Sequence, residues 1–317
     1  MAGKKVWITD YFNEFGHEES VLGPIITPTP SDEIEVIIVW HTWIGQEIID
    51  SLPNLKGIIR YGVGFDNVDI AYAASKGIPV CNNPDYGTEE VADTAIAMIM
   101  NINRGITEYD TVSRYLSDGT WQENVNESIK RTSETKLGIV GVGRIGGSVA
   151  NRAKALRFPV HFFDPYVLSG VDKLFGATRH ESLKSLLETC DIITIHTPLN
   201  DETEGMINTD FLNSMKRGAS LVNVSRGGIL NDINDLYEPL KRNEIRCVGL
   251  DVIPEEPPKP GRMIDAWRNK ERWLDGRLII NPHTAYYSQS AYDELRNNAA
   301  KMAKRVLDGE AMINQVN

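Results

Sequence analysis

The chain has 317 residues, of which 41% are hydrophobic, so it can bury the cores of two domains of roughly 100–200 residues each. Its formal net charge of −11 argues against direct binding to nucleic acid, which requires clustered Lys and Arg. The cysteines at 81, 190 and 247 are too widely spaced for a disulfide framework or a cysteine metal site, and no His pair has metal-binding helical spacing, so no metal is expected.

The chain begins M-A-G-K-K-V-W-I-T-D, and its charges come before any apolar stretch of leader length. No apolar run approaches the roughly 18 residues that a membrane span needs. We therefore expect a cytoplasmic protein that does not bind a membrane.

The first part of the chain alternates short apolar runs with helical patterns. Prolines at 24, 28 and 30 mark a loop between the first two runs. The pattern predicts strands at 6–9, 35–40, 55–60 and 78–82, and helices at 44–52 and 71–76. This is a small α/β unit.

A longer helix follows, with Thr88 in a capping position, two glutamates in the first turn and apolar residues at helical spacing as far as Ile102. Residues 104–136 are polar and predict a helix plus an irregular arm. The arm either grips a partner subunit or is a solvated connector.

The stretch 137–164 predicts a strand, a tight turn, a helix and a second strand that ends in an acid. Gly141 permits the tight turn, Gly143 lets the backbone approach a pyrophosphate, and Gly146 lets the helix sit close to the strand. Asp164 follows Gly141 by about the 20 residues expected of a dinucleotide-binding unit. The stretch therefore predicts a cofactor site.

Two further features of this stretch define the cofactor. The helix that begins near Arg144 and Ile145 offers free amides and a partial positive charge to phosphates. Asp164 can accept hydrogen bonds from both ribose hydroxyls and would repel a 2′-phosphate, and no Lys or Arg occurs at 165–169. We therefore expect NAD rather than NADP.

Four later apolar runs, at 192–195, 220–224, 247–252 and 278–280, predict parallel strands buried on both faces. The final helical pattern, 291–307, could fold back onto the first unit. The predicted fold is α/β, with two Rossmann-like doubly wound parallel-sheet domains and a cleft between them. Residues 1–102 plus 286–317 would form a discontinuous substrate-binding domain, and residues 103–285 the NAD-binding domain.

Ligands bind beyond the carboxyl ends of parallel strands, and polar residues gather there. Taken singly, each could be an ordinary loop residue, but together they suit the reduction of a 2-keto acid. Arg226 would anchor the carboxylate and polarise the keto oxygen, His283 would exchange a proton with that oxygen, and Glu256 would orient the imidazole and favour its protonated form. The residues that follow these strands are His196, Thr197 and Pro198, which we expect to contact the cofactor, then Arg226, then Glu255 and Glu256, then His283.

The chain resembles the D-isomer-specific 2-hydroxyacid dehydrogenases along nearly its whole length. The motifs that carry the resemblance are G-V-G-R-I-G, H-T-P-L, N-V-S-R-G-G, G-L-D-V-I-P-E-E-P and N-P-H-T-A. The resemblance implies that Arg226, Glu256 and His283 are the catalytic residues, and Glu256 is preferred over Glu255 because it directly precedes the proline. It also implies that Thr94 and Asp251 contact the cofactor, and that the protein is a homodimer joined through its cofactor domains.

Within this family the chain is most similar to the C-terminal-binding-protein-like branch, through W-H-T at 40–42, R-Y-G-V-G-F-D-N-V-D-I at 60–70, V-C-N-N-P at 80–84 and P-H-T-A-Y-Y-S at 282–288. That branch usually has Trp where this chain has Tyr286, so its substrate does not carry over. The resemblance implies that Val63 and Gly64, with Arg60, hold the substrate carboxylate, and that His41 and Tyr286 line the pocket. A structural ion pair is the alternative for Arg60.

Residues 258–276 are an insertion relative to the common family pattern. Met263, Trp267, Lys270 and Leu274 are spaced to share a helical face. Such a face would pack over the edge of the cleft, against a subunit, or into the core.

We expect an NAD-dependent D-2-hydroxyacid dehydrogenase whose substrate is small and unphosphorylated, because Arg60 is the one extra cation near the predicted pocket. The alternative is a dimeric scaffold that senses NAD(H), as in the co-repressors of that branch, with little turnover. The chain ends at Asn317, just after its last predicted helix, and this favours the enzyme.

Overall fold

The computed structural model describes residues 5–10 and 14–317, and the chain divides into two compact units. The first comprises Met1–Gly87 and Tyr287–Asn317, and the second comprises Thr88–Tyr286. Residues 1–4, on which the expectation about a leader partly rests, lie outside the described part. Within the described ranges, no helix combines the length and the apolar character needed to cross a bilayer.

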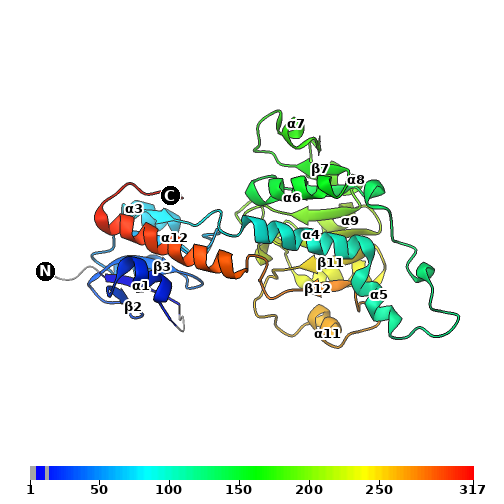
Figure 1. Cartoon of the computed structure of the whole chain (residues 1–317), viewed down its shortest axis with the longest axis horizontal. Helices are drawn as coiled ribbons and strands as arrows, with labels where there is room; N and C mark the ends of the chain where they lie inside the picture. The colour runs from blue at the N-terminus through cyan, green and yellow to red at the C-terminus, as the bar shows by residue number, and fades with distance from the viewer. Residues whose placement is uncertain (1–4, 11–13) are drawn as a thin grey trace. The chain divides into compact units, whose positions relative to one another are not determined.

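The first unit is a five-stranded parallel sheet with helices packed on it (Figure 1). Helices α1 and α12 pack against each other, and α12 also lies against β3 and β4, although it comes from the far end of the chain. The strand order is β2-β1-β3-β4-β5. The elements are β1 (Lys5–Ile8), α1 (Gly16–Leu22), β2 (Ile26–Thr27), β3 (Ile34–Val39), α2 (Gln46–Asp50), β4 (Gly57–Arg60), α3 (Ile70–Ser75), β5 (Val80–Cys81) and α12 (Gln289–Asp308).

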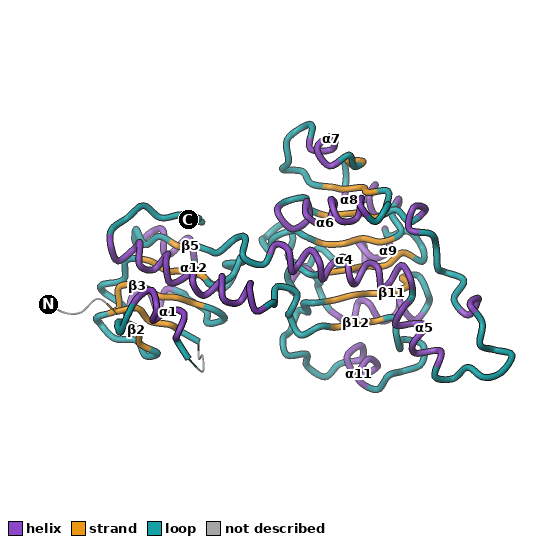
Figure 2. Tube along the Cα trace, in the orientation of Figure 1, coloured by secondary structure: helices purple, strands orange, loops and turns teal. Residues whose placement is uncertain are grey.

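The second unit is a seven-stranded parallel sheet with helices on both faces, and Figure 2 shows its strands side by side. Its elements are α4 (Thr88–Arg104), α5 (Ile106–Ser113), η1 (Glu123–Val125), η2 (Thr132–Glu134), β6 (Leu137–Val140), α6 (Arg144–Ala155), β7 (Val160–Phe163), α7 (Val171–Phe175), β8 (Thr178–Arg179), α8 (Leu183–Thr189), β9 (Ile192–Ile195), α9 (Thr209–Ser214), β10 (Ala219–Asn223), η3 (Gly227–Ile229), η4 (Ile233–Leu236), α10 (Tyr237–Lys241), β11 (Ile245–Leu250), α11 (Arg262–Arg268) and β12 (Leu278–Ile280).

The strand order of the second sheet has a switch point between β6 and β9. The order is β12-β11-β10-β9-β6-β7-β8, so the chain winds outward in one direction from β6 and in the other direction from β9. Ligands of doubly wound sheets bind at the carboxyl ends of the strands beside such a switch point. The strands are apolar on both sides because each face carries its own core: Leu221 and Val248 belong to one buried cluster, and Val222 and Cys247 to the other.

The prediction of two α/β domains with parallel sheets is confirmed. The compact units, however, divide at Gly87, whereas the sequence analysis placed the boundary after residue 102. The reason is that α4 packs against α6, β10 and β11 of the second unit. The sequence also missed β2 and β8, since each contributes only two residues to a sheet edge and neither makes an apolar run.

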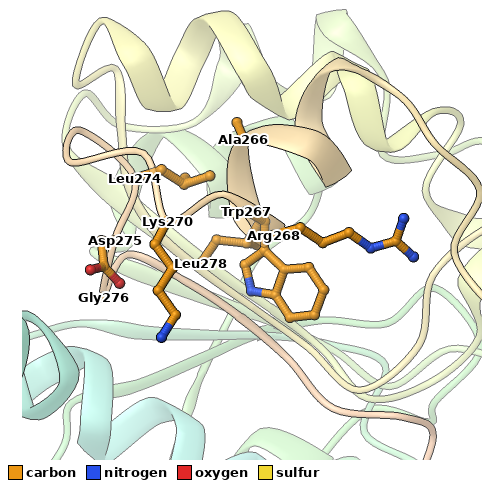
Figure 3. A pocket seen from close by; sticks show the side chains of 8 residues that line it. All are labelled: Ala266, Trp267, Arg268, Lys270, Leu274, Asp275, Gly276 and Leu278. Atoms are coloured by element: carbon orange, nitrogen blue, oxygen red, sulfur yellow. The ribbon is translucent and has the colours of Figure 1, made fainter.

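The insertion at 258–276 packs into the core of the second unit. Met263 and Leu274 are buried in its hydrophobic cluster. The predicted continuous helical face is wrong, because α11 ends at Arg268 and Lys270 takes a left-handed φ of +50°. Beside α11 lies a cavity of about 310 Å³, and Figure 3 shows the indole of Trp267 among its lining side chains.

Candidate active site

The turn after β6 has the geometry that a dinucleotide needs. Gly141 has a φ of +86°, in the left-handed region that favours glycine. A Cβ at Gly146 would lie 2.0 Å from the carbonyl oxygen of Gly141, so glycine lets α6 begin this close to the strand. At Gly143 a Cβ would meet nothing within 4 Å, so the turn borders open space where Arg144 and Ile145 begin the helix. Free amides at this helix end favour an anion.

The carboxylate of Asp164 is fixed just beyond β7. Its Oδ2 accepts a hydrogen bond from the Val142 amide at 3.0 Å, and its Oδ1 accepts one from the Tyr166 amide at 2.9 Å. A carboxylate has about four acceptor positions, so it keeps capacity for ribose hydroxyls. The sheet also brings Arg179 of β8 close by, where it donates to the backbone oxygen of Asp164 at 3.2 Å. No sequence pattern around residue 164 indicates this cation, because it comes from a neighbouring strand.

His196, Thr197 and Pro198 follow β9 directly and lie against the glycine turn, since a Cβ at Gly141 would be 3.0 Å from the His196 oxygen. Burial lowers the pKa of His196 to about 3, so this imidazole is neutral. Its Nε2 lies 2.9 Å from the Thr194 hydroxyl. Its Nδ1 and the Thr197 hydroxyl are buried without a hydrogen-bond partner in the described structure.

Glu256 and His283 form a hydrogen-bonded pair in the second unit. The His283 Nδ1 lies 2.8 Å from Glu256 Oε2, and Glu256 Oε1 accepts a hydrogen bond from the Ile253 amide at 3.1 Å. Burial raises the pKa of Glu256, but hydrogen bonds from His283 and Ile253 and the nearby charges of His283 and Arg226 outweigh it, so the net pKa is lowered. Glu256 is therefore ionised at neutral pH, and its bond to Nδ1 leaves Nε2 of the imidazole for proton exchange. The neighbouring Glu255 instead pairs with Lys259 at 2.7 Å.

The backbone at His283 is held in an unusual conformation by Asp251. His283 has a φ of +54°, which few residues other than glycine adopt without support. The buried Asp251 carboxylate accepts hydrogen bonds from the Thr284 and Ala285 amides at 3.0 and 2.9 Å. The Thr94 hydroxyl donates to the Ala285 oxygen at 3.3 Å. The two residues expected at the cofactor, Thr94 and Asp251, thus both support the turn that carries His283.

Arg226 lies in the turn after β10, and the side chain of Asn223 stabilises this turn. The buried Asn223 side chain accepts from the Ser225 amide at 3.0 Å and donates to the Arg226 oxygen at 3.0 Å. The Arg226 Nη1 donates to the Ser225 oxygen at 2.8 Å. Asn223 is not among the predicted site residues, although an Asn side chain that bonds to the amide two residues later is a known turn signal.

The other expected substrate residues divide between the two units. Arg60, Val63 and Gly64 lie at or just after the carboxyl end of β4 in the first unit, and His41 lies exposed just beyond β3. Tyr286 ends the second unit, where it packs against the same hydrophobic cluster as α4.

Comparison with known proteins identifies the family. Residues 96–285 match the model described as "D-isomer specific 2-hydroxyacid dehydrogenase, NAD binding domain". The chain belongs to the D-isomer-specific 2-hydroxyacid dehydrogenase family. A glyoxylate reductase of Korarchaeum cryptofilum is 36% identical over 82% of this chain and 74% of its own length. A D-3-phosphoglycerate dehydrogenase of Methanocaldococcus jannaschii is 34% identical over 90% of the chain, which spans about half the length of that relative (52%).

Solved structures of this family have the same fold. The D-lactate dehydrogenase of Aquifex aeolicus, complexed with NAD and lactic acid, superposes with a TM-score of 0.84 at 27% identity and covers 96% of each chain. An NADPH-dependent glyoxylate/hydroxypyruvate reductase of Sinorhizobium meliloti superposes with a TM-score of 0.81 at 25% identity, over 99% of this chain and 96% of its own. Both coenzymes therefore occur on this fold.

The second unit of this family member fits NAD. The turn at Gly141–Gly146 offers an anion site, and Asp164 directly follows β7, the position from which an acid binds the ribose in dinucleotide-binding folds. The unpartnered Nδ1 of His196 and hydroxyl of Thr197 sit beside that turn, and buried polar atoms without partners cost about 1–3 kcal/mol unless a ligand completes them. The Asp164 carboxylate would repel a 2′-phosphate, and Arg179 lies at the backbone oxygen of the same residue.

We expect Asp164→Ala to lower the ratio of kcat/KM for NADH to kcat/KM for NADPH by about 10–100-fold, because two charge-assisted hydrogen bonds to the ribose and the repulsion of a 2′-phosphate are lost together. Steady-state rates with both coenzymes measure this ratio. Asp201→Ala, an exposed acid in the loop after β9, is the control. An unchanged ratio in the Asp164 variant would remove this residue from the ribose site.

Proposed function

We propose that this protein is an NAD-dependent dehydrogenase that interconverts a small 2-keto acid and the D-2-hydroxy acid. The observation that carries the proposal is the Glu256–His283 pair, with Arg226 at the end of the neighbouring strand and its charge acting on Glu256. A cation for a carboxylate and an imidazole for an oxygen are the two groups that such a reaction requires from a protein.

In the proposed mechanism Arg226 binds the substrate carboxylate and polarises the keto oxygen through its planar set of donors. Bound NADH supplies the hydride for the carbonyl carbon. His283 gives the proton on Nε2 to the carbonyl oxygen, so that ketone, hydride and proton together make the hydroxy acid. The Glu256 carboxylate holds the Nδ1–H and stabilises the protonated ring. In the oxidative direction the neutral imidazole takes the proton back.

For the first unit we assign Arg60 and the amides of Val63 and Gly64 to the substrate carboxylate, and His41 to the substrate pocket. Tyr286 of the second unit is assigned to substrate binding as well. The substrate is expected to be unphosphorylated. The relatives are named for glyoxylate, lactate and 3-phosphoglycerate, which are small 2-keto or 2-hydroxy acids, and these names support the proposed substrate class.

The experiment is NADH oxidation at 340 nm against glyoxylate, pyruvate, hydroxypyruvate, branched and aromatic keto acids and 3-phosphohydroxypyruvate at several pH values. Turnover of about 1–1000 per second on one acid would support the proposal. Slow turnover on every acid, together with tight NADH binding, would contradict it.

Glu256→Gln is expected to lower kcat/KM for reduction by about 10–100-fold. Glutamine keeps an acceptor oxygen for Nδ1 of His283, which lies 2.8 Å from Glu256 Oε2, but it removes the negative charge beside the ring. Steady-state rates of reduction and oxidation at neutral pH test this. Glu255→Gln, which removes only the contact to Lys259, should leave both rates unchanged, and normal rates in Glu256→Gln would remove the carboxylate from the mechanism.

The proposed assembly is a homodimer formed through the arm at 104–136. Large apolar side chains are exposed along it: Ile106 is 59% exposed, Tyr115 63% and Trp121 70%. Exposed apolar residues gathered on one segment mark interaction sites. Sedimentation equilibrium with Trp121→Glu tests this, and an unaltered mass would exclude Trp121 from the interface.

The three buried free thiols fit the reducing cytoplasm that we propose as the location.

A further inference from the structure

A neighbouring amide helps to orient the side chain of Arg60. Arg60 is the last residue of β4, and its Nε donates a hydrogen bond to Asn67 Oδ1 at 2.9 Å. Because a guanidinium is planar, a bond at Nε restricts the direction of its two terminal nitrogens. On the other side the group lies against Gly62, where a Cβ would be 3.1 Å from Arg60 Nη1.

The amide of Asn67 is itself fixed in one orientation. Its Nδ2 donates to the backbone oxygens of Trp40 at 3.2 Å and of Thr42 at 3.0 Å. A flipped amide would place an oxygen against both carbonyls and would present an NH₂ group to the donor of Arg60. The orientation seen satisfies all three neighbours at once.

The segment that Asn67 holds is the one that contains His41. Asp10 accepts hydrogen bonds from the Trp40 amide at 2.7 Å and from the His41 amide at 3.1 Å, so this segment is held from both sides. The backbone oxygen of Asn67 also accepts from the Ile44 amide at 2.9 Å. Asn67 thus joins the strand end that carries Arg60 to the segment after β3.

We propose that Asn67 is a positioning residue for substrate binding: its amide holds the Arg60 guanidinium and the Trp40–Thr42 backbone in the arrangement that receives a 2-keto acid carboxylate. The inference rests on the role of Arg60 in the proposed function and adds the residue through which that role is set. A hydrogen bond to a charged group in a partly buried site is strong enough for its loss to affect affinity. Asn67 itself need not touch the substrate.

The test is a double-mutant cycle in the NADH-loaded full chain, with glyoxylate as the kinetic probe and oxamate as an unreactive carboxylate probe measured by calorimetry. Asn67→Ala should raise the KM for glyoxylate and the Kd for oxamate about tenfold, with kcat within about threefold and NADH affinity unchanged. When Arg60 is already replaced by alanine, Asn67→Ala should raise the KM for glyoxylate and the Kd for oxamate by less than about twofold further, because Asn67 acts through Arg60.

Two further variants separate positioning from general destabilisation. Gly62→Ala removes no hydrogen bond but displaces the guanidinium of Arg60 by a few tenths of an ångström. It should therefore raise the KM for glyoxylate when Arg60 is present and should not change this KM in the Arg60→Ala variant. Asn54→Ala removes a similar side-chain bond, from Nδ2 to the Asp32 oxygen at 2.7 Å, elsewhere in the first unit and should leave KM unchanged.

Equal effects of Asn67→Ala with and without Arg60 would overturn the inference, as would a normal KM in Asn67→Ala when Arg60→Ala raises it. If Arg60→Ala leaves the KM for glyoxylate and the Kd for oxamate unchanged, Arg60 does not bind the substrate carboxylate. The positioning role of Asn67 is then rejected as well. These outcomes distinguish the failure of the positioning role from the failure of the proposed role of Arg60.

Discussion

Replacing His283 with asparagine should lower kcat by about 10²–10⁴-fold while leaving NADH affinity within about twofold. Asparagine suits this test because it tolerates the left-handed backbone that His283 adopts, at a φ of +54°, and because its amide cannot transfer a proton at neutral pH. The turn should keep its shape, since the Asp251 carboxylate accepts hydrogen bonds from the backbone amides of Thr284 and Ala285 and does not bond to the imidazole.

The measurement combines turnover at saturating keto acid with NADH titration by fluorescence. The matched control is His17→Asn, which removes another imidazole next to a carboxylate, with Nε2 3.4 Å from Asp293 in the first unit. The control should retain turnover. If NADH affinity of the His283 variant falls in parallel with kcat, His283 has a structural role, and a normal kcat would end its assignment as the proton donor.

The parts of the structure that local sequence patterns determine were predicted well. The glycine turn and Asp164 could be predicted because each position there meets a steric or electrostatic demand within one βαβ unit. The strands β6, β9, β10 and β11 could be located because burial on both faces makes them nearly continuously apolar.

The features that were missed depend on contacts between distant segments. Arg179 reaches the Asp164 loop only because β8 pairs with β7, and no pattern around residue 164 indicates this. Asn67 could not be selected either, since its partners Arg60, Trp40 and Thr42 meet only when the sheet forms. Asp251 was expected at the cofactor because of its motif, and its support of the His283 turn became visible only with the amides of Thr284 and Ala285 in place.

A second large effect is expected from Gly227→Ala, a change that touches no reacting group. A Cβ at Gly227 would lie 1.9 Å from the carbonyl oxygen of Ile253 and 3.0 Å from the nitrogen of Pro254. Both contacts are to backbone, so no side chain can move aside to relieve them. The added methyl group must push apart the turn that carries Arg226 and the loop whose Ile253 amide binds Glu256.

Because a displacement of about 1 Å in a catalytic group can cost about 100-fold in rate, we expect kcat/KM to fall by about that factor, together with a lower melting temperature from the overpacking. Gly228→Ala is the matched control: its Cβ would meet only the Leu199 side chain, at 3.1 Å, which can rotate, so activity should stay within about threefold. Binding of NADH by Gly227→Ala should persist, since the glycine turn at 141–146 is untouched. Full activity in Gly227→Ala would show that the spacing between the Arg226 turn and the Glu256 loop does not limit the reaction.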